Sequence, residues 1–146
     1  MSKDPVVATA NATKELLARE RFVGLIYDVC RSDDGITNAV IAKGLSVFHT
    51  SVNLIDYDCL MPNIITEPHP TIGAEFIQRA LYVTSQKIAL LLPLKFMETL
   101  AAKNIIDKTP LVRVYVLTKR LPFRRGCMGW FVWEKGNFDK PSIRWI

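Results

Sequence analysis

The sequence contains only three cysteines and no long apolar run. Cys30, Cys59 and Cys127 are odd in number and lack the spacing of a Cys-x-x-Cys motif or a metal site, so they predict reduced thiols and not a disulfide framework. The most apolar segment, 87–96, has the length of one strand, whereas a membrane-spanning helix needs about 18 apolar residues. Residues 1–12 also lack the basic and apolar regions of a signal peptide. We therefore expect a cytoplasmic protein with no membrane contact.

Length and composition predict one globular domain. The chain has 146 residues, of which 49% are hydrophobic and 23% are charged, and a chain of this size can bury a substantial core. The small and polar start of the sequence predicts a flexible tail over residues 1–12, followed by a single domain over residues 13–146. Within that domain we expect a short helix over residues 13–21.

The hydrophobic pattern predicts an α/β fold. Apolar runs that alternate with helical segments favour a doubly wound, mostly parallel sheet, and two closely spaced final strands favour a C-terminal antiparallel hairpin. In that hairpin Trp130 and Trp133 fall on opposite faces, so one should be less buried than the other. Predicted strands lie at 22–29, 45–52, 54–57, 63–66, 87–92, 112–117, 129–134 and 143–146. Predicted helices lie at 37–43, 71–81 and 96–106, the last with Leu100 and Ala101 turned inward.

The most informative segment is a buried strand that ends in Glu67-Pro68-His69-Pro70 and leads into an amphipathic helix. This order of elements resembles a class I S-adenosylmethionine-dependent methyltransferase. In detail it resembles the small adenine-N6-type methyltransferases common in phages and mobile elements. The resemblance covers residues 22–146 and is carried by segments 63–66, 74–81, 87–94, 113–117 and 129–134.

The resemblance implies a cofactor site after the first two strands, and the residues there are altered. Asp28 matches the acidic residue that opens the family's glycine turn, but Ser32 and Asp34 stand where glycines normally let the backbone approach the cofactor. Gly35 restores the turn if the alignment moves by one residue. An ordinary turn between strand and helix, capped by Ser32 or Asp33, is the other interpretation. Ser51 occupies the position of the carboxylate that holds the ribose, and it offers no bidentate acceptor.

The catalytic loop is altered as well. In the resembling family an Asn/Asp-Pro-Pro-Tyr/Phe loop accepts a hydrogen bond from the target amine and stacks on the flipped base. Glu67 is one methylene longer, which moves the acceptor by about an ångström. Pro70 has no ring with which to stack on a base. His69 offers a ring and an acid/base group near neutral pH, or is a bystander in the loop.

A second candidate surface lies near the C-terminus. Lys119, Arg120, Arg124 and Arg125 concentrate positive charge, and Trp130 follows shortly after them. Cations beside aromatic side chains are typical of nucleic-acid or partner-binding surfaces. A solvated loop and the internal packing of a terminal hairpin are the alternative interpretations of the same residues.

The sequence therefore predicts a degenerate, non-catalytic methyltransferase-fold protein of phage or mobile-element type that binds nucleic acid or a host protein. S-adenosylmethionine is the cofactor that the resemblance implies, and the altered loops favour its loss. One alternative is an active nucleic-acid adenine methyltransferase in which Glu67 positions the amine and Asp28 borders the cofactor. A second is a small-molecule enzyme that uses the same cleft.

Overall fold

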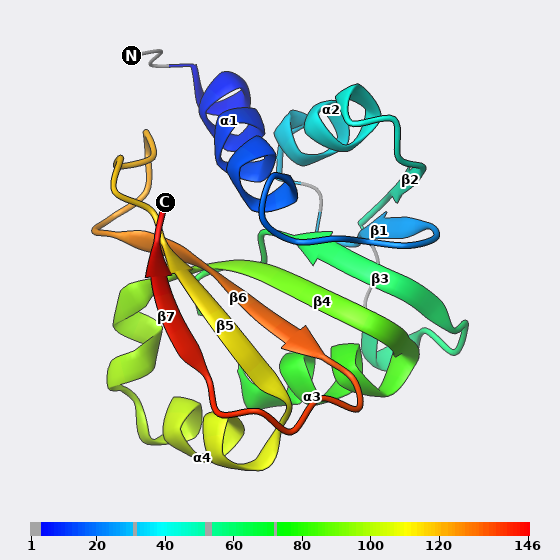
Figure 1. Cartoon of the computed structure of the whole chain (residues 1–146), viewed down its shortest axis with the longest axis vertical. Coiled ribbons are helices and arrows are strands. Elements are labelled where there is room, and N and C mark those ends of the chain that lie inside the picture. Colours follow the sequence, from blue (N-terminus) through cyan, green and yellow to red (C-terminus); the bar gives the residue numbers. More distant parts are fainter. Residues whose placement is uncertain (1–3, 31, 52–53, 72) are drawn as a thin grey trace.

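A computed structural model describes residues 4–146 apart from 31, 52–53 and 72. Its centre is a seven-stranded sheet with the order β2-β1-β3-β4-β6-β5-β7 (Figure 1). β6 runs antiparallel to β4 and β5, and the remaining pairs are parallel. The predicted α/β fold with its antiparallel hairpin is confirmed. The strands are β1 (Ile26–Asp28), β2 (Val47–His49), β3 (Met61–Thr66), β4 (Thr84–Pro93), β5 (Leu111–Val116), β6 (Met128–Glu134) and β7 (Ser142–Trp145).

Helices cover both faces of the sheet, and each face has its own core. α1 (Pro5–Leu17) and α2 (Gly35–Ala42) pack on one face, where the core includes Leu16, Val40 and Trp130. α3 (Ala74–Val83) and α4 (Leu100–Lys108) pack on the other, with Ile77 and Trp133 in their core. Two 3-10 helices, η1 (Leu54–Asp56) and η2 (Leu94–Glu98), complete the fold. No helix in the described part of the chain is long and apolar enough to cross a membrane.

The prediction of a flexible tail is wrong for residues 5–12, which form most of α1. Asp4 caps this helix by accepting a hydrogen bond from the Val6 amide at 2.9 Å, and Pro5 occupies its first turn. Thr9 and Thr13 are fully buried, and their hydroxyls donate to backbone carbonyls one turn earlier in the same helix. A segment that appears polar in the sequence is therefore compatible with burial. Residues 1–3 of the predicted tail lie outside the described residues.

Several predicted elements change their limits. The expected strand at 54–57 is the 3-10 helix η1, whose Leu54 carbonyl accepts from Arg79 Nε at 2.8 Å. The expected helix at 96–106 is divided at Thr99, whose hydroxyl caps α4 by accepting from the Ala102 amide. Leu100 is 73% exposed and Ala101 is also exposed, whereas Ala102 and Ile105 are buried. The prediction for the inward face was wrong because the Thr99 cap sets where α4 starts. The start of the helix in turn determines which of its residues face the sheet.

The two tryptophans of β6 are both buried, contrary to the prediction that one would be less so. Trp130 is 0% exposed and Trp133 is 1% exposed. Trp130 belongs to the core beneath α1 and Trp133 to the core on the other face of the sheet, so opposite orientations lead to two different buried positions. Each indole N–H has a partner at 3.0 Å, the Ala12 carbonyl for Trp130 and the Thr109 hydroxyl for Trp133. Trp130 is therefore a core residue and cannot form part of a partner-binding surface.

Candidate functional site

The candidate site begins at the carboxyl ends of β1 and β3, which lie side by side in the sheet. Asp28 ends β1 and is 1% exposed. Its Oδ1 accepts a hydrogen bond of 2.6 Å from Thr66 Oγ1 at the end of β3, and Thr66 in turn accepts from the Cys30 amide. Asp28 Oδ2 is buried and has no hydrogen-bond partner among the described residues. The acidic residue implied by the resemblance is thus present but withdrawn from solvent.

Burial changes the acid–base properties of Asp28 and Cys30. Burial raises the pKa of Asp28 to about 6, an effect that the hydrogen bond from Thr66 opposes only in part. The negative charge of Asp33 raises it further, and His49 lowers it. Burial also raises the pKa of the Cys30 thiol to about 11. At neutral pH Cys30 is therefore a protonated thiol and not a nucleophile.

We expect Asp28→Asn to stabilise the protein at pH 7 and to remove part of its pH dependence. The folded-state pKa of about 6 lies above the ordinary value of 3.8, so the folded chain binds this proton more tightly than the unfolded chain. Stability should fall as pH rises from 4 to 6, and the substitution should recover roughly 1–3 kcal/mol at pH 7. Urea unfolding between pH 4 and 7.5 measures both effects, with the exposed Asp139→Asn as control. A loss of stability at pH 7 in Asp28→Asn would contradict the prediction.

Glu67, the first residue of the predicted catalytic loop, is held by Arg124. Arg124 Nη2 donates to Glu67 Oε1 at 2.6 Å and Nε donates to Oε2 at 3.0 Å, which is a bidentate ion pair. The two side chains are only 13% and 10% exposed. The hydrogen bonds to Glu67 raise the pKa of Arg124 above its usual range. Ser32 Oγ also donates to Glu67 Oε1, at 3.3 Å, so both carboxylate oxygens are occupied.

The same arginine reaches Thr9 and Asp33, of which the sequence suggested only Asp33, as a candidate cap of the turn after the first strand. Arg124 Nη2 donates to Thr9 Oγ1 at 2.8 Å and lies 3.6 Å from Asp33 Oδ2. Asp33 Oδ2 lies 3.1 Å from Thr9 Oγ1, and Asp33 Oδ1 accepts from the Gly35 amide at 2.7 Å, at the start of α2. Thr9, Asp33, Glu67 and Arg124 form what we term the Arg124 cluster. No local pattern predicts it, because its members are contributed by four distant segments.

The remaining residues of the predicted cofactor site are arranged differently from an open glycine turn. Ser32 and Asp34 are exposed, whereas Gly35 is buried as the first residue of α2. An added Cβ on Gly35 would lie 2.6 Å from Thr9 Cβ, so this glycine permits the close contact between α1 and α2. Ser51 forms an antiparallel bridge with Cys30. The chains that leave β1 and β2 are thus paired where the resemblance places the ribose.

The other residues of the predicted catalytic loop differ in their exposure. Pro68 is buried, and Pro70 and His69 are exposed. His69 Nδ1 lies 2.7 Å from Thr71 Oγ1 and accepts from the Thr71 amide at 3.2 Å. No hydrogen bond connects His69 with Glu67 within the residues described. The structure therefore brings Glu67 and Arg124 together, but it does not join His69 to them.

The loop that supplies Arg124, residues 118–127, has a second and exposed side, which we term the basic-aromatic loop. Lys119, Arg120 and Arg125 are exposed, and Phe123 is 88% exposed. Phe123 also has a φ of +60°, an unfavourable conformation for a bulky side chain. The Thr118 amide donates to the carbonyl of Ile146 at 2.9 Å, so the base of the loop is fixed to the end of β7. Sequence reasoning missed Phe123, because neither its exposure nor its φ has a sequence signature.

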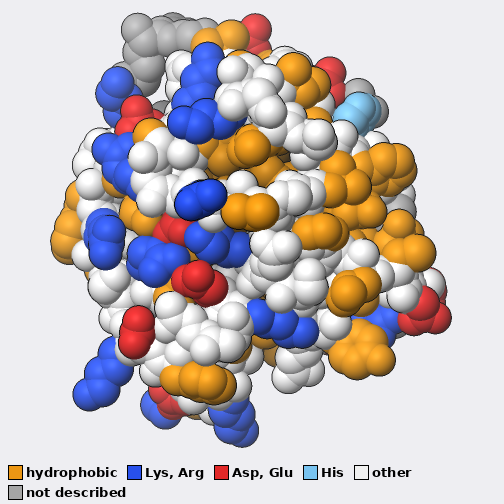
Figure 2. Space-filling model, turned by 45° about the vertical axis from the view of Figure 1, so that its right-hand side comes forward, with side chains coloured by type: hydrophobic (Ala, Val, Ile, Leu, Met, Phe, Trp, Pro, Cys, Tyr) orange, Lys and Arg blue, Asp and Glu red, His pale blue; other side chains and the backbone are white. Residues whose placement is uncertain are grey.

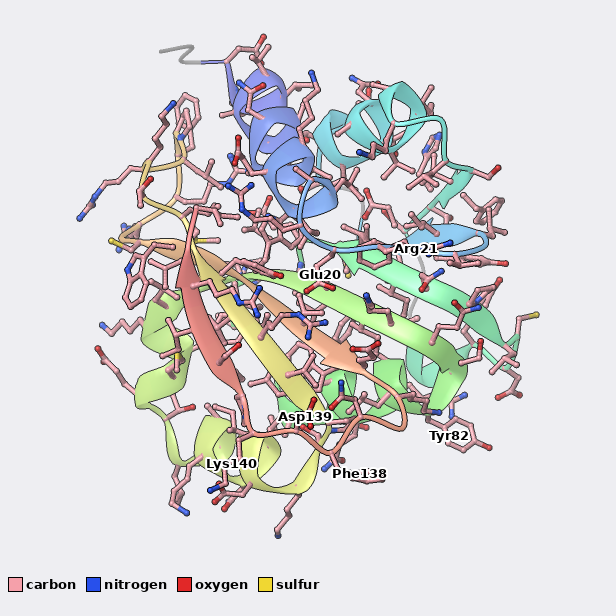
Figure 3. The ribbon with its side chains drawn as sticks, in the orientation of Figure 1. Glu20, Arg21, Tyr82, Phe138, Asp139 and Lys140 are labelled. Carbon is pink, nitrogen blue, oxygen red and sulfur yellow. The ribbon has the colours of Figure 1, made fainter. Side chains whose placement is uncertain are left out.

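Charged side chains also gather in the open part of the sheet beneath the end of α1. Figure 2 shows Lys and Arg side chains around acidic ones on this face. Glu20 lies among them, with a side chain that is 3% exposed and paired with Lys87 and Arg113. Figure 3 places Glu20 and Arg21 where the chain passes from α1 towards β1. This cluster is separate from the carboxyl ends of β1 and β3.

Comparison with known proteins identifies the fold. No family model and no curated protein matches the chain. The methyltransferase subunit of a type I restriction-modification system from Streptococcus thermophilus is 13% identical with a TM-score of 0.59, over 99% of this chain and 47% of that subunit. Magnesium protoporphyrin IX methyltransferase from Synechocystis, with bound S-adenosylmethionine, is 10% identical with a TM-score of 0.56, over 89% and 81% of the two chains.

A protein from Agrobacterium tumefaciens predicted to be an O-methyltransferase is 12% identical with a TM-score of 0.64, over 97% of this chain and 85% of that one. The chain thus has the Rossmann-like fold of class I S-adenosylmethionine-dependent methyltransferases. It spans about half the length of the Streptococcus subunit. Identities this low establish the fold alone.

Proposed function

We propose that this methyltransferase-fold protein does not transfer methyl groups and instead binds single-stranded nucleic acid through the basic-aromatic loop. The bidentate contact between Arg124 and Glu67 carries the first half of the proposal. In the resembling family the residue at this position accepts a hydrogen bond from the target amine. Here the guanidinium of the chain's own arginine supplies those N–H donors. The proposed loss of catalysis follows because both carboxylate oxygens already accept hydrogen bonds and the carboxylate is paired with a cation.

The exposed side of the same loop supports the second half of the proposal. Arg124 anchors the loop from within, so its two neighbours, Phe123 and Arg125, project into solvent. Backbone strain of roughly 1–3 kcal/mol persists where the surroundings impose it, commonly at functional sites. An exposed ring stacks on any base, and exposed cations bind the phosphates. These properties suit a single strand whose bases are accessible.

Nucleic acid is preferred over a host protein as the partner for a further reason. Two of the similar structures are subunits of type I restriction enzymes or restriction-modification systems. Their likeness to this chain is one of fold, so it supports the preference without establishing it. The phage or mobile-element origin suggested by the sequence is likewise part of the proposal.

We expect Phe123→Ala to weaken the binding of a 20-nucleotide single strand roughly tenfold, because one stacked base contributes about 1–3 kcal/mol. Arg125→Ala should weaken the binding as well. It should also reduce the slope of log affinity against log salt concentration by about the contribution of one phosphate contact. Fluorescence anisotropy at several salt concentrations measures both effects. Phe138→Ala is the matched control, because Phe138 is 94% exposed in the β6–β7 connection. Equal losses in Phe123→Ala and Phe138→Ala would contradict the proposed surface.

A calorimetric titration of the same protein with S-adenosylmethionine tests the proposed loss of catalysis. We expect no binding at millimolar cofactor. Micromolar binding, together with methyl transfer to the oligonucleotide, would overturn the proposal and restore the active methyltransferase as the better explanation. Arg124→Ala, which releases Glu67, shows in the same assay whether the ion pair alone prevents activity.

A further inference from the structure

The amino-terminal edge of the parallel strands, opposite the Arg124 cluster, contains a hollow of about 450 Å³. One side of it is formed by Arg21 and Val23, in the segment that crosses from α1 to β1, where Figure 3 labels Arg21. The hollow and the basic-aromatic loop are at opposite ends of β6. The lining of the hollow includes Arg21, Val23, Asn63, Gln86, Glu134 and Lys135.

Asn63 gives this hollow an unsatisfied acceptor. The side chain is 0% exposed on β3, and its Nδ2 donates to the Val23 carbonyl at 2.8 Å. Its Oδ1 is buried and has no hydrogen-bond partner within the described part of the chain. Buried amide oxygens are rarely left unpaired in folded proteins. The side chain has no accessible surface, so an N–H group that enters the hollow reaches Oδ1 only when the side chains that cover it move aside.

The cations around the hollow fall into two groups. Lys87 Nζ donates to Glu20 Oε2 at 2.9 Å, and Arg113 Nη2 donates to Glu134 Oε2 at 3.2 Å, so these two charges are compensated. Arg21 and Lys135 have no ion pair among the residues described. The hollow therefore keeps two uncompensated positive charges, which suit an anionic group at its entrance.

We propose that this hollow binds a nucleoside monophosphate. The phosphate lies between Arg21 and Lys135, where charge-assisted hydrogen bonds are strong. The base enters the hollow, displaces the side chains that cover Asn63 Oδ1 and donates an N–H to it, with the half-exposed Val23 side chain against its ring. A volume of about 450 Å³ is within the range of small-molecule sites. The same chemistry is offered by a free nucleotide and by the phosphorylated end of a strand.

Titration of the ¹⁵N-labelled chain with AMP, GMP, CMP and UMP tests the site by NMR. We expect the backbone amides of residues 21–24 and 85–87 and the Asn63 side-chain amide to shift at millimolar nucleotide or below. Arg21→Ala and Lys135→Ala should each weaken the binding roughly fivefold or more, because each removes a charge-assisted contact. Lys108→Ala, at the end of α4 on the other face of the sheet, should leave it unchanged. All three side chains are exposed, and the spectra themselves report whether each variant is folded.

Further arms distinguish the source of the ligand. Equal shifts with a 5′-phosphorylated oligonucleotide, lost on dephosphorylation, would identify a strand end; shifts with mononucleotides alone would identify a free nucleotide. Three results would overturn the proposal: no shifts at millimolar nucleotide, shifts unaffected by Arg21→Ala and Lys135→Ala, or an equal response to inorganic phosphate without a shift at Asn63. The hollow does not depend on the basic-aromatic loop, so Phe123→Ala should leave mononucleotide binding intact. The two proposals can therefore fail separately.

Discussion

Glu20→Ala should lower the free energy of unfolding by roughly 3–5 kcal/mol, the range measured when one partner of a buried ion pair is removed. The Glu20 side chain is 3% exposed, and its partners Lys87 and Arg113 are 13% and 19% exposed. Tyr115 also donates its hydroxyl to Glu20 Oε1 at 2.7 Å. Truncation would leave two cations and a buried hydroxyl without their common acceptor.

The acid–base behaviour of the cluster agrees with this expectation. Burial raises the pKa of Glu20, but hydrogen bonds from Arg113, Lys87 and Tyr115 outweigh burial and hold the pKa below its ordinary value. Burial and the hydrogen bond to Glu20 raise the pKa of Tyr115 to about 12. Glu20 is therefore charged at neutral pH, and its contribution to stability should be lost only as the pH falls below about 4.5.

Urea unfolding followed by tryptophan fluorescence measures the loss. Glu15→Ala is the matched control, because Glu15 is an acidic residue near the end of α1 and pairs with Arg19 at 2.7 Å, but at 54% and 40% exposure. We expect that exposed pair to contribute only about 0.5 kcal/mol. The loss of stability in Glu20→Gln should lie between those of Glu20→Ala and Glu15→Ala, because glutamine keeps the shape of the side chain and removes its charge. Similar losses in Glu20→Ala and Glu15→Ala would contradict the assignment of Glu20 as the centre of the cluster.

Gly35→Ala is the second substitution for which we expect a large effect. The added Cβ would lie 2.6 Å from Thr9 Cβ, 2.7 Å from the Val6 carbonyl oxygen and 2.9 Å from the Ala10 amide nitrogen. Two of these three atoms belong to the backbone of α1, so relief requires movement of the helix. Overpacking of this kind costs about 1–3 kcal/mol and occasionally more. Because Thr9 accepts a hydrogen bond from Arg124, the displacement of α1 should also disturb the Arg124 cluster.

Thermal unfolding and the NMR shifts of Thr9 and Arg124 test this expectation. Gly73→Ala is the control, since Gly73 precedes α3 with a φ of −97° and no atom within 4 Å of an added Cβ. Gly73 is the N-cap of α3, so we expect the control to lose no more than about 1 kcal/mol, the difference between Gly and Ala at a cap. If Gly35→Ala unfolds at the same temperature as Gly73→Ala, the contact between α1 and α2 is looser than the structure indicates.

The fold was predictable because its strands are short apolar runs in a characteristic order. The buried strand before Glu67 and the apolar run of β4 each carry a local signal, and so does the final antiparallel strand. α1 was predictable only in part, because buried threonines that bond to their own helix appear polar in a sequence. Local pattern is therefore a sound guide to the sheet and a poor guide to its first helix.

The candidate site was harder to predict, because its decisive contact joins residues far apart. Glu67 and Arg124 were each identified, but they were placed on two different surfaces, and 57 residues separate them. Nothing in either segment indicates the other as its partner. Phe123 was overlooked for a related reason, since its φ of +60° is imposed by the loop and not by the residue type. Contacts of this kind are determined by tertiary structure.

The Arg124 cluster also has a consequence for the order in which the molecule assembles. Arg124 donates a hydrogen bond to Thr9, which is 115 residues away in the chain. At the base of the same loop, the Thr118 amide donates to the carbonyl of Ile146. Long-range closures of this kind are slow to form, because chain entropy is lost before the contacts are gained. A chain emerging from the ribosome would therefore present the basic-aromatic loop in its native geometry only after β7 and Ile146 had been released.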